Sequence, residues 1–565
     1  MIRHRSSFAR QTVLLLLCLT GATACPAQSP ARDTVYRLHG TVIDGVTGKP
    51  LPRALVKSGD QRLATMTGVD GKFSIDISVP ERPANPAARS GSAFSGMRAS
   101  VVLMAQKPGY LLIQNRLTPI AVGEALSSTP VELKLMPAAA ITGHVSSAAT
   151  DFAAGVRVSL LAHRVQDGHR FWTPAGAGIT NAQGNFRFPN LNPGEYTVLT
   201  SQWNGDQPRP AARLAITQQY PPTFYGDVRN LAGSAKLHLH YGDTARTEIH
   251  LHLTPYYSVT VPIASGPSAT GVNTRMTGPE NFSGYQFRYN RAENAVEGSL
   301  PSGDYTFMLS GANGGQQQLF ALLPLHIESS PVRTAAVALA PAAAIEVRVH
   351  AQLTKQDNSN GADFSGGISS ASRGIRQPPL AQLILRSEDG GNGYAGSRRT
   401  ADGELLIENV QPGSYVVQPQ VFRGYVASMT SGGVDLLDRP LVVNGSSPPD
   451  PIDVTIRDDT ATLTGAIEPG DDSLPQMSYI ALLATDSSGH FVQGFAGSEG
   501  KFTVTNIPPG SYRALAFSGP PVQLPYRDAE AMHAYDDKGV AITFTANQSQ
   551  QVDLPLLDGP AQEEQ

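Results

Sequence analysis

The residues best suited to bind a metal ion are four histidines arranged in two pairs, His238 with His240 and His250 with His252. Because side chains two positions apart in a strand share a face, each pair projects to one side while the intervening leucines point the other way. If the two strands pair as a hairpin, four imidazoles meet on one surface, which is a ligand set for a transition metal such as Zn, Ni or Cu. The alternatives are histidines that face solvent above an apolar face, or strands that are not neighbours.

Aromatic residues form a second candidate site, for a ligand rather than a metal. They include both tryptophans of the chain and a Tyr-Pro-Pro-Thr-Phe-Tyr segment: Trp172, Trp203, Tyr220, Phe224 and Tyr225. Exposed aromatic rings provide stacking platforms for the apolar faces of sugars, but the same rings also fill hydrophobic cores. Two interpretations therefore stay open for these positions, a glycan-binding surface and a packed cluster.

The motifs of common enzymes are missing from the sequence. No histidine is followed by a glutamate three positions later, which excludes the zinc-ligand pattern of a metallocarboxypeptidase. There is no Gly-x-Ser-x-Gly elbow and no phosphate-binding loop, and the two cysteines, Cys18 and Cys25, both lie near the N-terminus. The sequence therefore predicts a protein that is not an enzyme and needs no cofactor, apart from the metal considered above.

The charge balance excludes nucleic acid as a partner. Lys and Arg total 43 against 47 Asp and Glu, and the pI is about 6.4. The chain therefore lacks the excess of positive charge that nucleic-acid binding requires. The 55 glycines and 43 prolines predict many turns and few long helices. No apolar run approaches the length of a membrane span, so the mature chain is predicted to be soluble.

The N-terminus has the three-part pattern of a secretory signal peptide, predicted at residues 1–27. Arginines precede an apolar run at residues 13–19, and small residues follow up to Ala24. Cys25 is an alternative lipidation site, although Ala22 stands where a lipoprotein signal normally has Leu. Either pattern exports the protein, to the periplasm, the outer membrane surface or the exterior.

One phrase recurs in the body of the chain and defines its repeats. It reads NLNPGEY at 190–196, LPSGDY at 300–305, NVQPGSY at 409–415 and NIPPGSY at 506–512. The interval of about 100 residues is the length of one small β-sandwich. A tyrosine two positions after the glycine can bury its ring while its hydroxyl reaches a backbone group, so we expect these tyrosines to be core residues.

Turns that feed strands precede three of these phrases, at 183–188, 402–407 and 499–504. In each of them a glycine can supply the positive φ of a hairpin turn, and apolar residues alternate afterwards. These patterns predict an all-β fold.

The first repeat resembles a known family. It reads GTVID at 40–44, TGKPLP at 47–52, ALV at 54–56, DGKFSI at 70–75 and KPGY at 107–110. These motifs resemble the carboxypeptidase regulatory-like domain, and the resemblance implies a transthyretin-like, Ig-like β-sandwich grouped with carbohydrate-binding-like folds. It concerns the non-catalytic accessory domain of carboxypeptidases. Similar openings recur at 141–145 and 463–467, whereas the third repeat lacks both the opening glycine and the Asp-Gly turn.

Together these patterns predict a tandem array of about five modules. The names first to fifth module are kept below for residues 34–136, 137–255, 256–342, 343–457 and 458–558. The predicted function is an exported, non-enzymatic binding protein of the cell envelope or exterior, with a glycan or another surface polymer as ligand. The first alternative is a structural spacer or assembly protein whose partners are envelope proteins. The second is a metal-binding protein built on the histidine hairpin.

Overall fold

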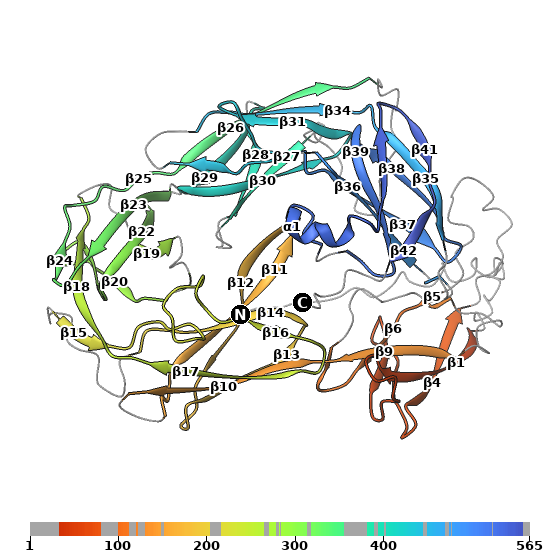
Figure 1. The fold of residues 1–565 in the computed structure, drawn as a ribbon, viewed down its shortest axis with the longest axis horizontal. Coiled ribbons are helices and arrows are strands. Elements are labelled where there is room, and N and C mark those ends of the chain that lie inside the picture. The colour runs from red at the N-terminus through yellow and green to blue at the C-terminus, as the bar shows by residue number, and fades with distance from the viewer. Residues whose placement is uncertain are drawn as a thin grey trace, which may run out of the picture. The chain divides into compact units, whose positions relative to one another are not determined.

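The computed structural model contains almost only β-strands in the residues that it describes, which confirms the predicted all-β fold of tandem sandwiches (Figure 1). It describes residues 33–80, 100–111, 120–121, 130–148, 152–203, 216–264, 271–277, 282, 284–312, 318–354, 381–388, 394–400, 403–444, 449–468, 474–475, 477–486, 488–521 and 524–557. No helix in these ranges is long and apolar enough to cross a membrane. The chain divides into two compact units, Met1–Met136 and Pro137–Gln565.

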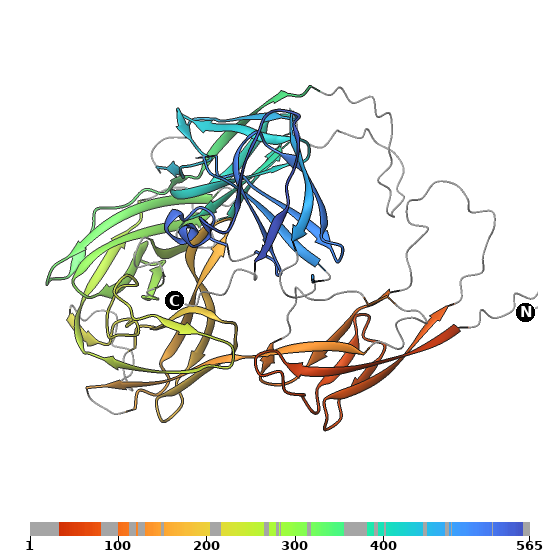
Figure 2. The ribbon, with the colours of Figure 1, turned by 45° about the vertical axis from the view of Figure 1, so that its right-hand side comes forward.

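The first unit, red to orange in Figure 2, is built on two main sheets, with strand orders β4-β1-β9-β7 and β3-β2-β6. Its core includes Leu38, Val56 and Phe73, all at most 5% exposed. Its strands are β1 (Asp33–Asp44), β2 (Leu55–Ser58), β3 (Ala64–Met66), β4 (Lys72–Pro80), β5 (Ser100–Val101), β6 (Leu103–Gln106), β7 (Tyr110–Leu111), β8 (Ile120–Ala121) and β9 (Val131–Pro137).

The second module has two sheets, β13-β10-β17 and β12-β11-β14-β16, which enclose one core. Its strands are β10 (Ala139–Ser147), β11 (Arg157–Gln166), β12 (His169–Ile179), β13 (Asn185–Leu191), β14 (Gly194–Thr200), β16 (Leu237–Leu239) and β17 (Thr244–Leu251).

The third module uses a strand contributed by the second. Strand β15 (Ile216–Gln219) pairs with β18 (Thr254–Pro262), so the boundary expected after residue 255 falls inside a strand. The sheets are β15-β18-β21-β20, with β24 beside β18, and β19-β22-β23-β25. The other strands are β19 (Val272–Thr277), β20 (Phe287–Asn290), β21 (Ala295–Leu300), β22 (Gly303–Ala312), β23 (Gln318–Ile327), β24 (Val332–Arg333) and β25 (Ala340–Pro341).

In the fourth module a single strand, β28, pairs with both sheets and joins them into the order β32-β31-β34-β26-β29-β28-β27-β30-β33. The strands are β26 (Ala343–Gln352), β27 (Ala381–Ser387), β28 (Tyr394–Arg399), β29 (Leu405–Val410), β30 (Gly413–Val421), β31 (Tyr425–Ser431), β32 (Val434–Asp435), β33 (Leu441–Val443) and β34 (Ile452–Arg457).

In the fifth module the order of paired strands closes on itself, because a late strand pairs with the first one. The order is β36-β37-β38-β35-β42-β39, and β39 pairs again with β36. The strands are β35 (Ala461–Glu468), β36 (Met477–Ala484), β37 (Phe491–Gly497), β38 (Lys501–Ile507), β39 (Gly510–Phe517), β40 (Val540–Phe544), β41 (Ser549–Gln551) and β42 (Leu554–Leu557). Between β39 and β40 lie α1 (Ala529–Met532) and a 3₁₀ helix at His533–Tyr535.

The repeated phrase forms the predicted tyrosine corner in all four copies. In each copy the tyrosine is at most 7% exposed, and its hydroxyl donates to the backbone carbonyl four residues earlier. The bonds run from Tyr196 to Asn192 (2.7 Å), Tyr305 to Pro301 (3.0 Å), Tyr415 to Gln411 (2.8 Å) and Tyr512 to Pro508 (2.9 Å). These tyrosines are core residues, as predicted.

An asparagine at the start of the phrase creates a β-bulge in three copies. Asn190, Asn409 and Asn506 have φ of 58°, 58° and 61°, a left-handed conformation that asparagine tolerates better than most residues. The pairing with the opposite strand shifts by one residue at each of these points. The third module has Ser299 there instead, and its register runs on without a shift.

Candidate binding site at a junction of three modules

The site begins at a tight hairpin in the second module. Gln166 of β11 pairs with His169 of β12, so Asp167 and Gly168 form a two-residue turn. Their φ values, +50° and +79°, are both positive, as in a type I′ turn, for which Asp-Gly is a favoured sequence. The twist of such a turn matches that of its strands, and the tip therefore has a defined position.

This hairpin tip contacts the fifth module. A Cβ atom on Gly168 would lie 2.8 Å from the ring of Tyr526, so the ring packs directly on the glycine. The backbone N–H of Arg527 donates to the carbonyl of Gly168 at 3.4 Å, and Arg170 forms an ion pair of 3.6 Å with Asp528. Tyr526 is held in turn by Phe491, whose ring stacks on it at 4.5 Å.

The fourth module contacts both sides of this junction. The side-chain amide of Gln418 donates a hydrogen bond to Asp167, which lies 251 positions earlier in the chain. Arg527 donates from Nη1 to the carbonyl of Leu437 at 2.8 Å and from Nη2 to the carbonyl of Gly489 at 3.5 Å. The second, fourth and fifth modules are thus joined by direct hydrogen bonds.

His490 completes the contact between the fourth and fifth modules. Its Nε2 lies 3.0 Å from the carbonyl oxygen of Val426, and its ring meets Tyr425 edge to face at 6.0 Å. Because a carbonyl can only accept, Nε2 carries the proton and Nδ1 is left as an acceptor.

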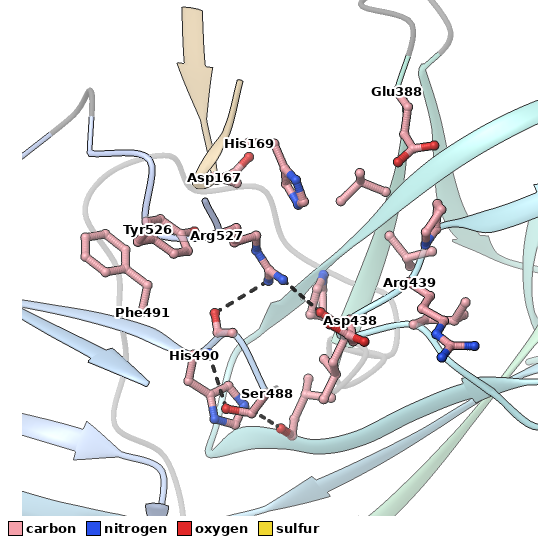
Figure 3. Close-up of a pocket in the computed structure, with 18 of the residues that line it drawn as sticks. Asp167, His169, Glu388, Asp438, Arg439, Ser488, His490, Phe491, Tyr526 and Arg527 are labelled. Atoms are coloured by element: carbon pink, nitrogen blue, oxygen red, sulfur yellow. Dashed lines mark hydrogen bonds between the residues drawn. The ribbon is translucent and has the colours of Figure 1, made fainter. Parts of the chain in front are cut away.

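These segments surround a cavity of about 400 Å³ (Figure 3). Its wall combines apolar side chains of the fourth module, such as Val416, Val421 and Leu437, with charged and polar groups from all three modules. The polar groups are Asp167, His169, Glu388, Asp438, Arg439, Ser488, His490, Tyr526 and Arg527.

Burial shifts the titration of the groups around this cavity. The pKa of His169 is lowered by burial and, secondarily, by the positive charge of Arg527. Burial also lowers the pKa of His490 and raises that of Tyr526. Both imidazoles are therefore less readily protonated than a free histidine side chain, and Arg527 is a permanent charge that acts on both.

Arg527 has no acidic partner among the described residues. A guanidinium has five N–H donors, and in the described part of the chain two of them bond to backbone carbonyls while none pairs with a carboxylate. Its Nε is buried without an acceptor among these residues. A partly buried cation without a counter-ion favours the approach of an anion.

The two histidine strands do not form the hairpin that the metal-site hypothesis required, and the alternative that they are not paired neighbours holds. The strand with His238 pairs with β14, whereas the strand with His250 pairs with β10 in the opposite sheet. Leu239 and Leu251 enter one core from these two sheets, so the alternating histidines point away from it on different faces. Within the described ranges no three His, Cys, Asp or Glu side chains are placed to hold a metal ion.

Individual histidines have acidic neighbours instead. His240 Nδ1 lies 3.1 Å from Asp243, and His250 Nδ1 lies 3.0 Å from Asp227. His238, His240, His250 and His252 are all exposed.

The predicted aromatic residues pack against other side chains. Tyr220 is 5% exposed and Phe224 is 1% exposed. Trp203 lies 5.1 Å from the ring of Tyr220, and Tyr225 packs on the same core. Trp172 stacks on His163 at 4.8 Å, with the Lys236 ammonium 4.6 Å from its ring centre. Glycan binding by these residues stays a prediction.

Sequence reasoning missed the residues of the junction. The Asp-Gly dipeptide at 167–168 is a signal for a hairpin, but nothing local indicates that its tip meets residues 418 and 526–528. The predicted signal peptide and Cys25 lie outside the described residues.

No family model matches the chain, and no curated protein sequence matches it. Among solved structures, the Bacillus anthracis TIE protein is 8% identical, with 92% of this chain and 67% of that chain covered and a TM-score of 0.14. The shaft pilin SpaA of Lactobacillus rhamnosus GG is 14% identical, with 39% and 98% covered and a TM-score of 0.19. The minor pilin of Streptococcus agalactiae is 13% identical, with 41% and 99% covered and a TM-score of 0.17. TM-scores this low carry no argument about function.

Proposed function

We propose that the protein is an exported, non-enzymatic structural protein of the cell envelope or exterior, which acts as a scaffold for other envelope proteins. The observation that carries this proposal is the junction at which the tip at Asp167–Gly168 bonds to Gln418 and to the backbone N–H of Arg527. Modules that bond to one another transmit force and orientation, which independent modules on flexible links do not.

The sequence supports the same function. It has the pattern of an export signal, lacks the common catalytic motifs, and repeats the phrase that forms the tyrosine corner. Each corner bond ties a strand to the loop before it, and so stiffens its own module. Stiff modules that also bond to one another suit a scaffold.

The test is to locate the protein and its assembly state in cells that produce it. Cell fractionation, surface proteolysis and native gels are expected to place it in the envelope or the medium as part of a larger assembly. A monomer confined to the cytoplasm would contradict the proposal.

A glycan array probed with the purified mature chain, residues 28–565, tests the other predicted function, which is glycan binding. Saturable binding to a defined sugar, lost in a Trp172→Ala, Trp203→Ala double variant, would favour glycan binding over the scaffold.

A further inference from the structure

The cavity at the junction has the size and position of a small-molecule site. Its volume of about 400 Å³ falls in the usual range for ligand pockets, which often lie between domains. Part of its wall is apolar and includes Val416 and Val421. Arg527 and His169 contribute polar, hydrogen-bonding groups to the same wall.

The guanidinium of Arg527 has hydrogen-bond donors to spare. Two of its five N–H groups bond to carbonyls and it also interacts with the hydroxyl of Tyr526, whereas its Nε has no acceptor among the described residues. A carboxylate accepts two parallel hydrogen bonds from such a planar group, and this pairing is stronger than a bond between neutral groups.

His169 offers a further donor on the same side of the cavity. Its imidazole lines the same cavity as Arg527, whose positive charge acts on it (Figure 3), and no hydrogen bond of the ring is found among the described residues. A neutral imidazole there can donate one N–H to the anion that Arg527 holds.

The cavity wall also carries three carboxylates, and none of them forms an ion pair with Arg527 among the described residues. Asp167 accepts a hydrogen bond from Gln418, Glu388 accepts one from the hydroxyl of Ser414, and Asp438 is exposed beside Arg439. The negative charges of Asp167 and Glu388 act on His169, so they oppose the binding of an anion near that ring. Arg527 is the partly buried cation with which a carboxylate can pair directly.

We propose that this cavity binds a small organic carboxylate. The carboxylate group pairs with Arg527 and accepts from His169, and the apolar part of the ligand lies against Val416 and Val421. The site is independent of the proposed scaffold function, since it requires only that the junction form.

The experiment is a calorimetric titration of the mature chain at neutral pH with hexanoate as the probe. Hexanamide and pentylamine serve as matched probes with the same pentyl chain and no negative charge. Hexanoate is expected to bind saturably and the other two are not. No saturable binding of hexanoate up to about 10 mM, or equal binding of hexanamide, would overturn the proposal.

Three variants locate the binding. Arg527→Gln is expected to weaken hexanoate at least about tenfold, since it removes a charge-assisted pair. Because Arg527 also bonds to two carbonyls of the junction, Val416→Phe provides a second test that fills the cavity and keeps the guanidinium. It should abolish binding, whereas Arg246→Gln, at an exposed position on β17 outside the cavity wall, should leave it unchanged. Retained binding in Val416→Phe, or loss in Arg246→Gln, places the ligand elsewhere and overturns the proposal.

Discussion

The hydroxyl of Tyr425 donates a hydrogen bond of 3.0 Å to Oδ1 of Asp459. Asp459 is 4% exposed and lies where the fourth module passes into the fifth, and its other oxygen accepts from Arg457. The neighbouring Asp458, 7% exposed, accepts from the backbone N–H of Thr354 at 2.7 Å. Two buried carboxylates therefore fix the link between these modules.

Replacing Tyr425 by phenylalanine should loosen this link. Because the lost bond is made to a charged acceptor, we expect the free energy of unfolding to fall by about 2 kcal/mol, as measured by urea denaturation. Burial, and then the hydrogen bond to Asp459, raise the pKa of Tyr425 to about 12. Its stabilising effect should therefore be complete below about pH 10 and lost as the pH rises toward 12. In an ultraviolet titration, Tyr425→Phe should show one fewer tyrosine that ionises at high pH than the unsubstituted protein. An unchanged titration would refute this assignment.

The tyrosine corner makes a prediction within a single module. In Tyr512→Phe the ring stays in the core but the bond to Pro508 is lost, so the unfolding free energy of the fifth module should fall by about 1 kcal/mol. Tyr479→Phe is the matched control, because no hydrogen bond of its hydroxyl is found in the described structure. Equal losses in the two variants would mean that the corner bond contributes nothing specific.

The hairpin tip can be tested with two glycines of positive φ. Gly168 (φ +79°) packs on Tyr526, whereas a Cβ added to Gly155 (φ +73°) would meet no atom within 4 Å. Alanine at either position costs about 1 kcal/mol of backbone strain. Only Gly168→Ala should also expose residues 524–528 to hydrogen exchange, because its methyl group displaces the Tyr526 ring. The same exchange pattern in Gly155→Ala would show that strain, and not the contact, is responsible.

Acid should weaken the junction through His490. Its pKa is lowered mainly by burial and also by Arg527, although the Val426 carbonyl and Asp486 act in the opposite sense. A lowered folded-state pKa means that stability is full above the unfolded value of about 6.5 and is lost as the pH falls through the folded value. NMR titration should give His490 a pKa below 6.5. In His490→Gln the exchange protection of residues 488–491 should lose this pH dependence, and an unchanged dependence would assign it to another group.

The parts of the structure that depend on neighbouring residues were predictable from the sequence. The corner of Tyr512 joins two residues four positions apart, and the bulge at Asn506 needs only a residue that accepts positive φ, so both follow from a short phrase. The histidine pairs did not meet as the metal-site hypothesis required. Alternation along a strand specifies which face a side chain takes but not which sheet the strand joins. The bond between Asp167 and Gln418 has no local signal, because it depends on how whole modules meet.

The returning strand order of the fifth module limits how this module can associate. Backbone groups at the rim of an open sheet can recruit a strand from another chain, which leads to polymers or aggregates. Here β42 pairs with both β35 and β39, and among the described strands β40 and β41, of five and three residues, retain an unpaired side. Templated growth by strand addition is therefore restricted at this module to the edges of β40 and β41 among the described strands, and elsewhere a partner has to recognise side chains.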